Sequence, residues 1–161
     1  MSIIKKIYSV LVTIFTVIVL IFGLVTAVPP IFGIKCYTVK SGSMEPVLQV
    51  GALTYINTNN TTPDVDDIAV YRIDDKTFVC HRVVRKTDDG YIFKGDANNS
   101  PDSVVVSQEN IVGTYIFDIP EIGYILSAFN RFKIFMLIIL LVALNISVII
   151  IENTDKNRKV N

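Results

Sequence analysis

The chain has 161 residues, enough for one modest domain, and 51% of them are hydrophobic, although the formal net charge is zero. The stretch from residue 29 to residue 131 contains 9 basic and 13 acidic residues. Because nucleic-acid partners favour a basic protein surface, we expect this acidic stretch to bind no nucleic acid.

Two long, uncharged apolar runs lie near the ends of the sequence. The first covers residues 8–28, "YSVLVTIFTVIVLIFGLVTAV", and reaches the roughly 20 residues that a helix needs to cross a bilayer. The second covers residues 134–151, "IFMLIILLVALNISVIII", and its only polar interruptions are Asn145 and Ser147. We therefore expect a transmembrane helix at each end, with the lipid bilayer as a partner of the chain.

The first run also resembles a secretory signal peptide, since Lys5 and Lys6 precede it and "VTAV" ends it. The apolar part of a signal peptide is usually about 7–15 residues long. The run in this chain is longer, which favours an uncleaved membrane anchor.

Basic residues flanking the spans predict the orientation in the membrane, because they remain on the cytoplasmic side. Lys5 and Lys6 place the N-terminus in the cytoplasm, and the basic tail "ENTDKNRKVN" agrees. Arg131 and Lys133 argue weakly for the opposite orientation. The expected order is a cytoplasmic N-terminus (1–7), a transmembrane helix (8–28), an extracytoplasmic domain (29–133), a transmembrane helix (134–151) and a cytoplasmic tail (152–161).

The middle segment alternates short apolar or β-branched runs with turn-rich stretches such as "KTDDG", which is typical of antiparallel strands. Seven strands are expected, over residues 36–40, 52–57, 68–73, 77–85, 91–94, 104–106 and 111–117. A helical pattern appears only after Pro120, where residues 121–132 favour a short helix at the membrane interface. The expected fold class is mostly β: a small antiparallel β domain flanked by two transmembrane helices.

His81 is the only histidine, and it lies in the expected strand "TFVCHRVVRK". Strand alternation places Val79, His81 and Val83 on one face and Cys80 on the other, which excludes a Cys80–His81 dyad. From the pattern alone, a half-buried histidine bonded to the backbone is the simpler interpretation. A zinc site is improbable because structural zinc takes four ligands. Cys36 and Cys80 lie where a disulfide is permitted, but free thiols are the simpler interpretation.

Ser43 lies in "SGSMEP", and two acidic residues, Asp96 and Asp102, lie in the loop "KGDANNSPDS". A serine becomes a nucleophile only when a base takes its proton. A carboxylate is the group that orients a catalytic histidine. All of these residue types are also common in turns, so each segment alone is equally consistent with a solvated turn.

Taken together, these segments resemble the membrane-bound type I signal peptidases, in the endoplasmic-reticulum-type branch that includes archaeal and W-type enzymes. Five boxes carry the resemblance in order: "SGSMEP", "DIAVYRI", "VCHRVV", "FKGDANNSPD" and "IVGTY". The family often has Gly-Asp where this chain has Gly51-Ala52, and Asp-Asp where it has Pro101-Asp102.

The resemblance implies a role for each site residue and an activity. It implies Ser43 as the nucleophile, His81 as the general base, Asp102 as the residue that orients the histidine, Ser41 as an oxyanion contact and Asp96 as a supporting acid. The implied activity is a serine endopeptidase that removes signal peptides from exported preproteins, with no cofactor. Accessory subunits stay open.

Two alternatives belong to other classes. The first alternative is a non-enzymatic membrane-anchored β domain that binds an extracytoplasmic partner. The second is a related self-cleaving or regulatory serine peptidase. The first does not explain the order of the boxes. The second typically uses a Ser-Lys pair in soluble proteins, which the two apolar runs disfavour.

Overall fold

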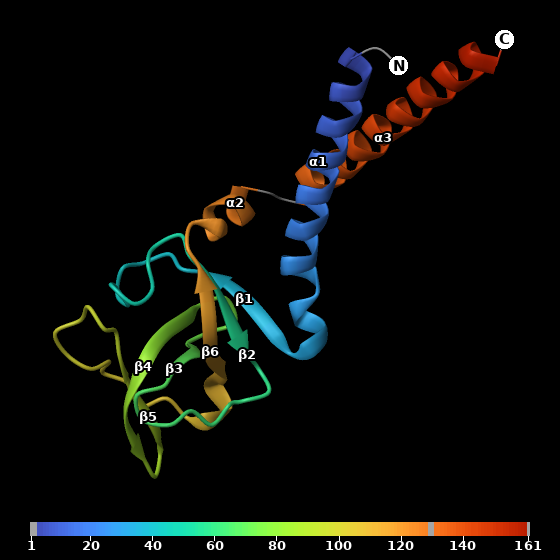
Figure 1. Ribbon diagram of the computed structural model, residues 1–161. Helices are drawn as coiled ribbons and strands as arrows, with labels where there is room; N and C mark the ends of the chain where they lie inside the picture. The colour runs from blue at the N-terminus through green and yellow to red at the C-terminus, as the bar shows by residue number, and fades with distance from the viewer. Residues whose placement is uncertain (1–2, 129–130, 161) are drawn as a thin grey trace. The chain divides into compact units, whose positions relative to one another are not determined.

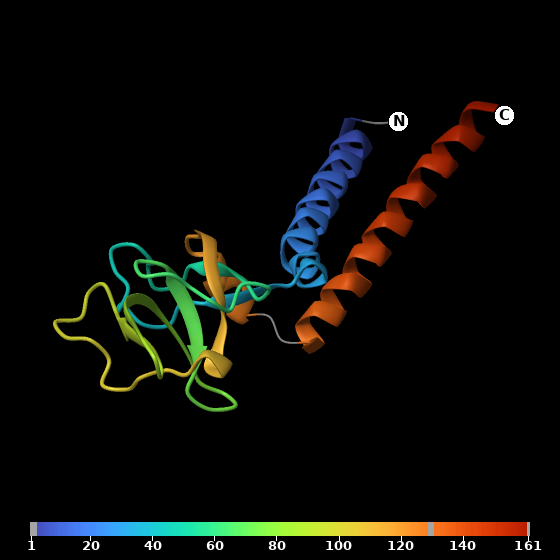
Figure 2. The same ribbon diagram turned by 90° about the horizontal axis from the view of Figure 1, so that it is seen from below.

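The computed structural model describes residues 3–128 and 131–160, which fall into two compact units. One unit combines residues 1–28 with 129–161, and the other is residues 29–128. Figures 1 and 2 show that the first unit is helical and that the second is built around a sheet.

The helical unit consists of α1 (Ile3–Ala27) and α3 (Arg131–Val160). Two segments are long and apolar enough to cross a membrane, Ile3–Phe32 and Lys133–Thr154, and they contain the two expected spans. Helix α3 continues through the expected tail as far as Val160.

Polar side chains inside the apolar helices bond to each other. Asn145 Nδ2 donates to Thr16 Oγ1 at 3.0 Å and to the Leu141 carbonyl at 2.8 Å. The hydroxyls of Tyr8 and Ser147 lie 2.7 Å apart. An unsatisfied polar group is expensive in hydrocarbon, so the two polar interruptions of the second span fit a position facing α1.

The second unit contains a six-stranded sheet in the order β1-β2-β6-β3-β4-β5, and every neighbouring pair is antiparallel. The strands are β1 (Ile34–Thr38), β2 (Leu53–Asn57), β3 (Ile68–Arg72), β4 (Phe78–Thr87), β5 (Gly90–Lys94) and β6 (Ile111–Ile119). Three short helices accompany them: η1 (Pro29–Phe32), η2 (Gln108–Asn110) and α2 (Ile122–Ala128). The predicted fold class, an antiparallel β domain with an apolar helix at each end of the chain, is confirmed.

Two expectations differ from the structure. The strand predicted at 104–106 is wrong, because only Val106 pairs, in an isolated bridge with Tyr91. Val106 is buried, whereas Val104 and Val105 are exposed, so only one of the three valines packs against the sheet. The short helix predicted over 121–132 is α2, which ends at Ala128, and residues 129–130 lie outside the described part of the chain.

Apolar clusters cover both faces of the β3–β4 hairpin. One cluster contains Ala69, Tyr71, Val83, Tyr91, Phe93, Val106 and Ile111. The other contains Met44, Leu48 and Ile68, with Cys80 packed against it. The alternation predicted for β4 is confirmed, since Val83 and Cys80 belong to opposite clusters. Burying side chains of this size contributes about 1.5–3 kcal/mol each, so the loop that carries Met44 and Leu48 is firmly attached.

The Asn145–Thr16 bond gives a testable prediction about the helical unit. Replacing Asn145 by Leu, or Thr16 by Val, should each weaken the association of α1 with α3 by about 0.6–1.7 kcal/mol, because each loses a hydrogen bond between helices. Unfolding in detergent micelles measures the change. The double variant should lose no more than either single one, and additive losses would show that the two side chains act independently.

Candidate active site

Ser43 lies in the loop that joins β1 to β2, and buried neighbours fix its position. Met44 is 2% exposed and Leu48 is fully buried, so both anchor this loop in the core. The Leu48 amide donates to the Met44 carbonyl at 2.9 Å, which closes a turn directly after the serine. Ser43 itself is half-buried.

His81 lies on β4, opposite Ala69 of β3, and on the same face of the hairpin as Val79 and Val83. Its side chain is only 10% exposed. The sequence predicted both this face and partial burial. The imidazole, however, bonds to side chains rather than to the backbone, so the simpler interpretation of a structural histidine is wrong about its partners.

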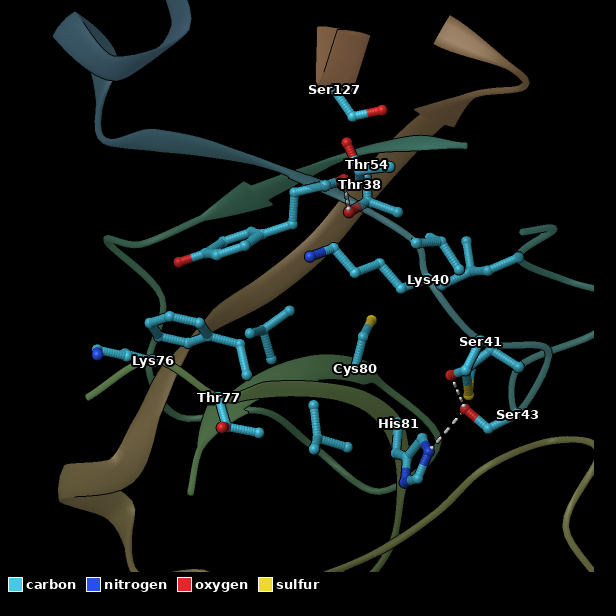
Figure 3. A pocket seen from close by; sticks show the side chains of 17 residues that line it. Thr38, Lys40, Ser41, Ser43, Thr54, Lys76, Thr77, Cys80, His81 and Ser127 are labelled. Atoms are coloured by element: carbon cyan, nitrogen blue, oxygen red, sulfur yellow. Dashed lines mark hydrogen bonds between the residues drawn. The ribbon is translucent and has the colours of Figure 1, made fainter. Parts of the chain in front are cut away.

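The imidazole bridges Ser43 and Asp102. His81 Nε2 lies 3.0 Å from Ser43 Oγ, a contact shown in Figure 3, and His81 Nδ1 lies 2.7 Å from Asp102 Oδ2. A carboxylate oxygen can only accept, so Nδ1 carries the proton in that bond. In the neutral ring, Nε2 then has the lone pair that accepts the serine hydroxyl proton.

Asp102 is held by two further groups. Its backbone amide donates to the Phe93 carbonyl at 2.8 Å, which attaches the acidic loop to β5. Its Oδ2 also accepts a hydrogen bond of 2.9 Å from the Tyr71 hydroxyl. Burial and the contact with Asp102 raise the pKa of Tyr71 well above its usual range, so this phenol remains a donor.

The acidic loop also contacts the backbone of the serine. The Ala97 amide donates to the Ser43 carbonyl at 2.9 Å. Gly95 makes this approach possible, because a Cβ at that position would lie 2.6 Å from the same carbonyl oxygen. The two loops that carry Ser43 and Asp102 are therefore joined directly as well as through the imidazole.

Asp96 does not join the chain of bonds from Ser43 to Asp102. It binds Arg82 with both carboxylate oxygens, at 2.9 Å to Nε and 2.7 Å to Nη2. Arg82 Nη1 also donates to the Asp66 carbonyl at 2.7 Å. The Arg82 guanidinium lowers the pKa of Asp96, and the same hydrogen bond raises the pKa of Arg82. This ion pair ties the acidic loop to the residue next to His81.

Ser41 lies beside the serine that it was predicted to support. Its Oγ is 3.4 Å from Ser43 Oγ, and the side chain is exposed at the same end of the cavity (Figure 3).

A cavity of about 760 Å³ opens beside Ser43 and His81 (Figure 3). Residues of β1 and its extension line one side, and residues 76–81 line the other. Lys40 and Lys76 are the charged groups among its described lining residues. Cys80 also lines it, but burial raises the pKa of this thiol to about 12, which excludes a thiolate nucleophile. Cys36 and Cys80 are free thiols. Within the described residues, no cluster of three or more potential ligands is suited to a metal ion.

Sequence reasoning missed Tyr71 and Arg82 as members of the site. Tyr71 lies in an apolar strand, where a tyrosine indicates core packing rather than a polar role. Strand alternation places it on the same face as His81, which is the one signal that was available.

Comparisons with known proteins point to a family of peptidases. Residues 31–116 match the family described as Peptidase S24-like. The signal peptidase complex catalytic subunit SEC11 of Verticillium alfalfae is 34% identical over 101 residues, covering 54% of this chain and 59% of that protein. Signal peptidase I W of Bacillus subtilis is 34% identical over 99 residues, covering 57% of this chain and 52% of that protein. The chain thus spans less than two thirds of either relative.

The names of both relatives agree with the resemblance predicted from the five boxes. The family match begins in η1 and ends in β6, so it contains Ser43, His81 and Asp102. It covers just over half of the chain. The chain therefore belongs to the Peptidase S24-like family.

Proposed function

We propose that this chain is a membrane-bound serine endopeptidase that removes signal peptides from exported preproteins. The observation that carries the proposal is the chain of hydrogen bonds from Ser43 Oγ through His81 to Asp102. In this proposal Ser43 is the nucleophile, His81 is the general base and Asp102 orients the imidazole. The hydrogen-bond partner of Ser43 is His81 rather than a lysine, which disfavours the self-cleaving Ser-Lys alternative.

The catalytic steps follow from the directions of these bonds. His81 Nε2 takes the proton of Ser43 as its oxygen attacks the scissile carbonyl, and the Asp102 carboxylate stabilises the imidazolium that forms. The oxyanion is stabilised by the backbone amide of Ser43 and the hydroxyl of Ser41. His81 then gives its proton to the leaving amine, and water releases the acyl group. Because only neutral imidazole accepts the serine proton, activity falls when His81 is protonated.

The cavity suits an extended peptide. Residues 78–81 of β4 pair with β3 on one side, but β5 pairs with β4 only from Arg82 onward. The other side of residues 78–81 therefore has no strand partner in the described sheet. β1 lies at the end of the sheet and also has a free edge. A peptide in the cavity is therefore able to add its backbone to an existing strand, with shallow apolar contacts for small side chains.

The proposed placement in the cell follows from the apolar helices. Residues 8–28 and 134–151 span the membrane, and the β domain (29–133) lies outside the cytoplasm, as the basic flanks predict. The ends, 1–7 and 152–161, are cytoplasmic; residues 1–2, 129–130 and 161 lie outside the described part.

Replacement of the proposed triad is the direct test. Ser43→Ala, His81→Ala and Asp102→Ala should each lower kcat/KM for a preprotein by about 10⁴-fold, because each removes a step of proton transfer or its orientation. The purified chain in lipid vesicles, supplied with a preprotein, gives the rates. Mature product from Ser43→Ala, in vesicles or in cells lacking other signal peptidases, would exclude the proposal. A binding-only domain would process nothing in any form.

The contact at Gly95 predicts a second loss of activity. Gly95→Ala should lower kcat by about 10²-fold, since the new Cβ displaces the Ser43 carbonyl and a shift of about 1 Å is enough for such a loss. Gly23→Ala is the control, because a Cβ there meets nothing within 4 Å. Normal kcat in folded Gly95→Ala would show that the loop shifts without moving the serine.

The Arg82–Asp96 pair predicts a loss of stability. Arg82→Gln should lower the free energy of unfolding by about 1.5–3 kcal/mol, because it removes charge-assisted hydrogen bonds from a carboxylate that is only 18% exposed. Lys86→Gln is the matched control; it breaks an ion pair with Asp64, which is 85% exposed, and should leave the free energy of unfolding nearly unchanged because solvent screens this pair. Thermal unfolding compares them.

The same pair has a defined pH dependence. Because the folded pKa of Asp96 is lowered, its contribution is present above the unfolded pKa and is lost as pH falls through the folded value. The difference between wild type and Arg82→Gln should therefore shrink on acidification. A difference that stays constant down to strongly acidic pH would contradict this role.

A further inference from the structure

The Asp102 carboxylate receives two donors on one oxygen. Oδ2 lies 2.7 Å from His81 Nδ1 and 2.9 Å from the Tyr71 hydroxyl. A carboxylate otherwise rotates broadly about its last side-chain bond. Two donors that converge on the same oxygen from fixed positions select one orientation of the group.

Tyr71 is built into the fold more firmly than a surface side chain. It is 6% exposed, and its ring centroid lies 4.7 Å from that of Phe93. The Phe93 carbonyl in turn accepts a hydrogen bond from the backbone amide of Asp102. The ring of Tyr71 and the backbone of Asp102 therefore both contact Phe93 of β5. This shared contact fixes the distance between the Tyr71 hydroxyl and Asp102 Oδ2.

We propose that Tyr71 is a positioning residue of the active site, whose hydroxyl sets the Asp102 carboxylate so that Oδ2 faces His81 Nδ1. This rests on the proposed function, since it assigns Tyr71 a role in that triad. The hydroxyl acts only as a donor and takes no proton during the reaction. By holding Asp102 it holds the imidazole, and so keeps Nε2 directed at Ser43 Oγ.

Tyr91 offers a comparison between Tyr71 and a tyrosine that only packs in the core. Tyr91 belongs to the same apolar cluster, is also 6% exposed, and has a ring centroid 6.3 Å from that of Phe93. Among the described residues its hydroxyl makes no hydrogen bond, whereas that of Tyr71 bonds to Asp102. Tyr91→Phe is therefore a matched control, because it removes the same atom from the same cluster without touching the carboxylate.

The test compares the two variants on preprotein cleavage by the full chain in lipid vesicles. Tyr71→Phe should lower kcat about 10- to 150-fold, the range expected for loss of a hydrogen bond to a charged group, with KM within about twofold of wild type. Tyr91→Phe should leave kcat unchanged. A serine-directed covalent probe counts the folded active sites, so kcat is expressed per competent enzyme even where a variant folds in low yield.

A double-mutant cycle distinguishes positioning through Asp102 from a general packing effect. In an Asp102→Ala background, Tyr71→Phe should reduce kcat by less than about twofold, because the group through which it acts is already gone. An undiminished loss in that background would overturn the proposal, as would wild-type kcat in Tyr71→Phe itself. Both outcomes leave the proposed function standing. Only cleavage by Ser43→Ala removes the function and the role of Tyr71 together.

Discussion

The site depends on one imidazole that makes a hydrogen bond on each side. His81 Nδ1 faces a carboxylate and Nε2 faces a serine hydroxyl, and the first contact decides what the second is able to do. Because the carboxylate accepts a hydrogen bond from Nδ1–H, the tautomer is fixed with a free lone pair on Nε2, toward Ser43. The contacting residues are 38 and 21 positions from the histidine in sequence, so the fold has to bring three distant segments together.

The fold does this by attaching each of the two loops at more than one point. Met44 and Leu48 bury the serine loop on one face of the β3–β4 hairpin, while His81 projects from the other face. The acidic loop is tied to β5 through Phe93, to the serine backbone through Ala97, and to β4 through the Arg82–Asp96 pair. Each tie alone is modest in energy. Together they fix both ends of the proposed proton-transfer path relative to β4, which packs against an apolar cluster on each face.

Much of this arrangement could be predicted from the sequence, but the contacts between the two loops and His81 could not. Alternation in "TFVCHRVVRK" predicted the face on which His81 lies, because a side-chain period of two is a local property of any strand. The distance from His81 to Ser43 depends on two irregular loops, whose conformation no local pattern encodes. The strand predicted at 104–106 was wrong for a related reason: three valines have high β-propensity, yet only Val106 reaches a partner. Tyr71 was missed because its role needs the position of a loop about thirty residues away.

Burial is distributed unevenly along the proposed triad, and this has a consequence for the direction of the reaction. The His81 side chain is 10% exposed and that of Asp102 is 17% exposed. Ser43 and His81 both line the cavity, whereas Asp102 is not among its lining residues. In a low-dielectric surrounding the attraction between imidazolium and carboxylate is stronger than in water, so the charge pair formed on proton transfer is stabilised where solvent is scarce. In the proposed mechanism the peptide, and later the water that releases the acyl group, therefore enter through this cavity. The Asp102 carboxylate and the Tyr71 hydroxyl are not among the residues that line the cavity, so in the proposed mechanism they act on the substrate only through His81.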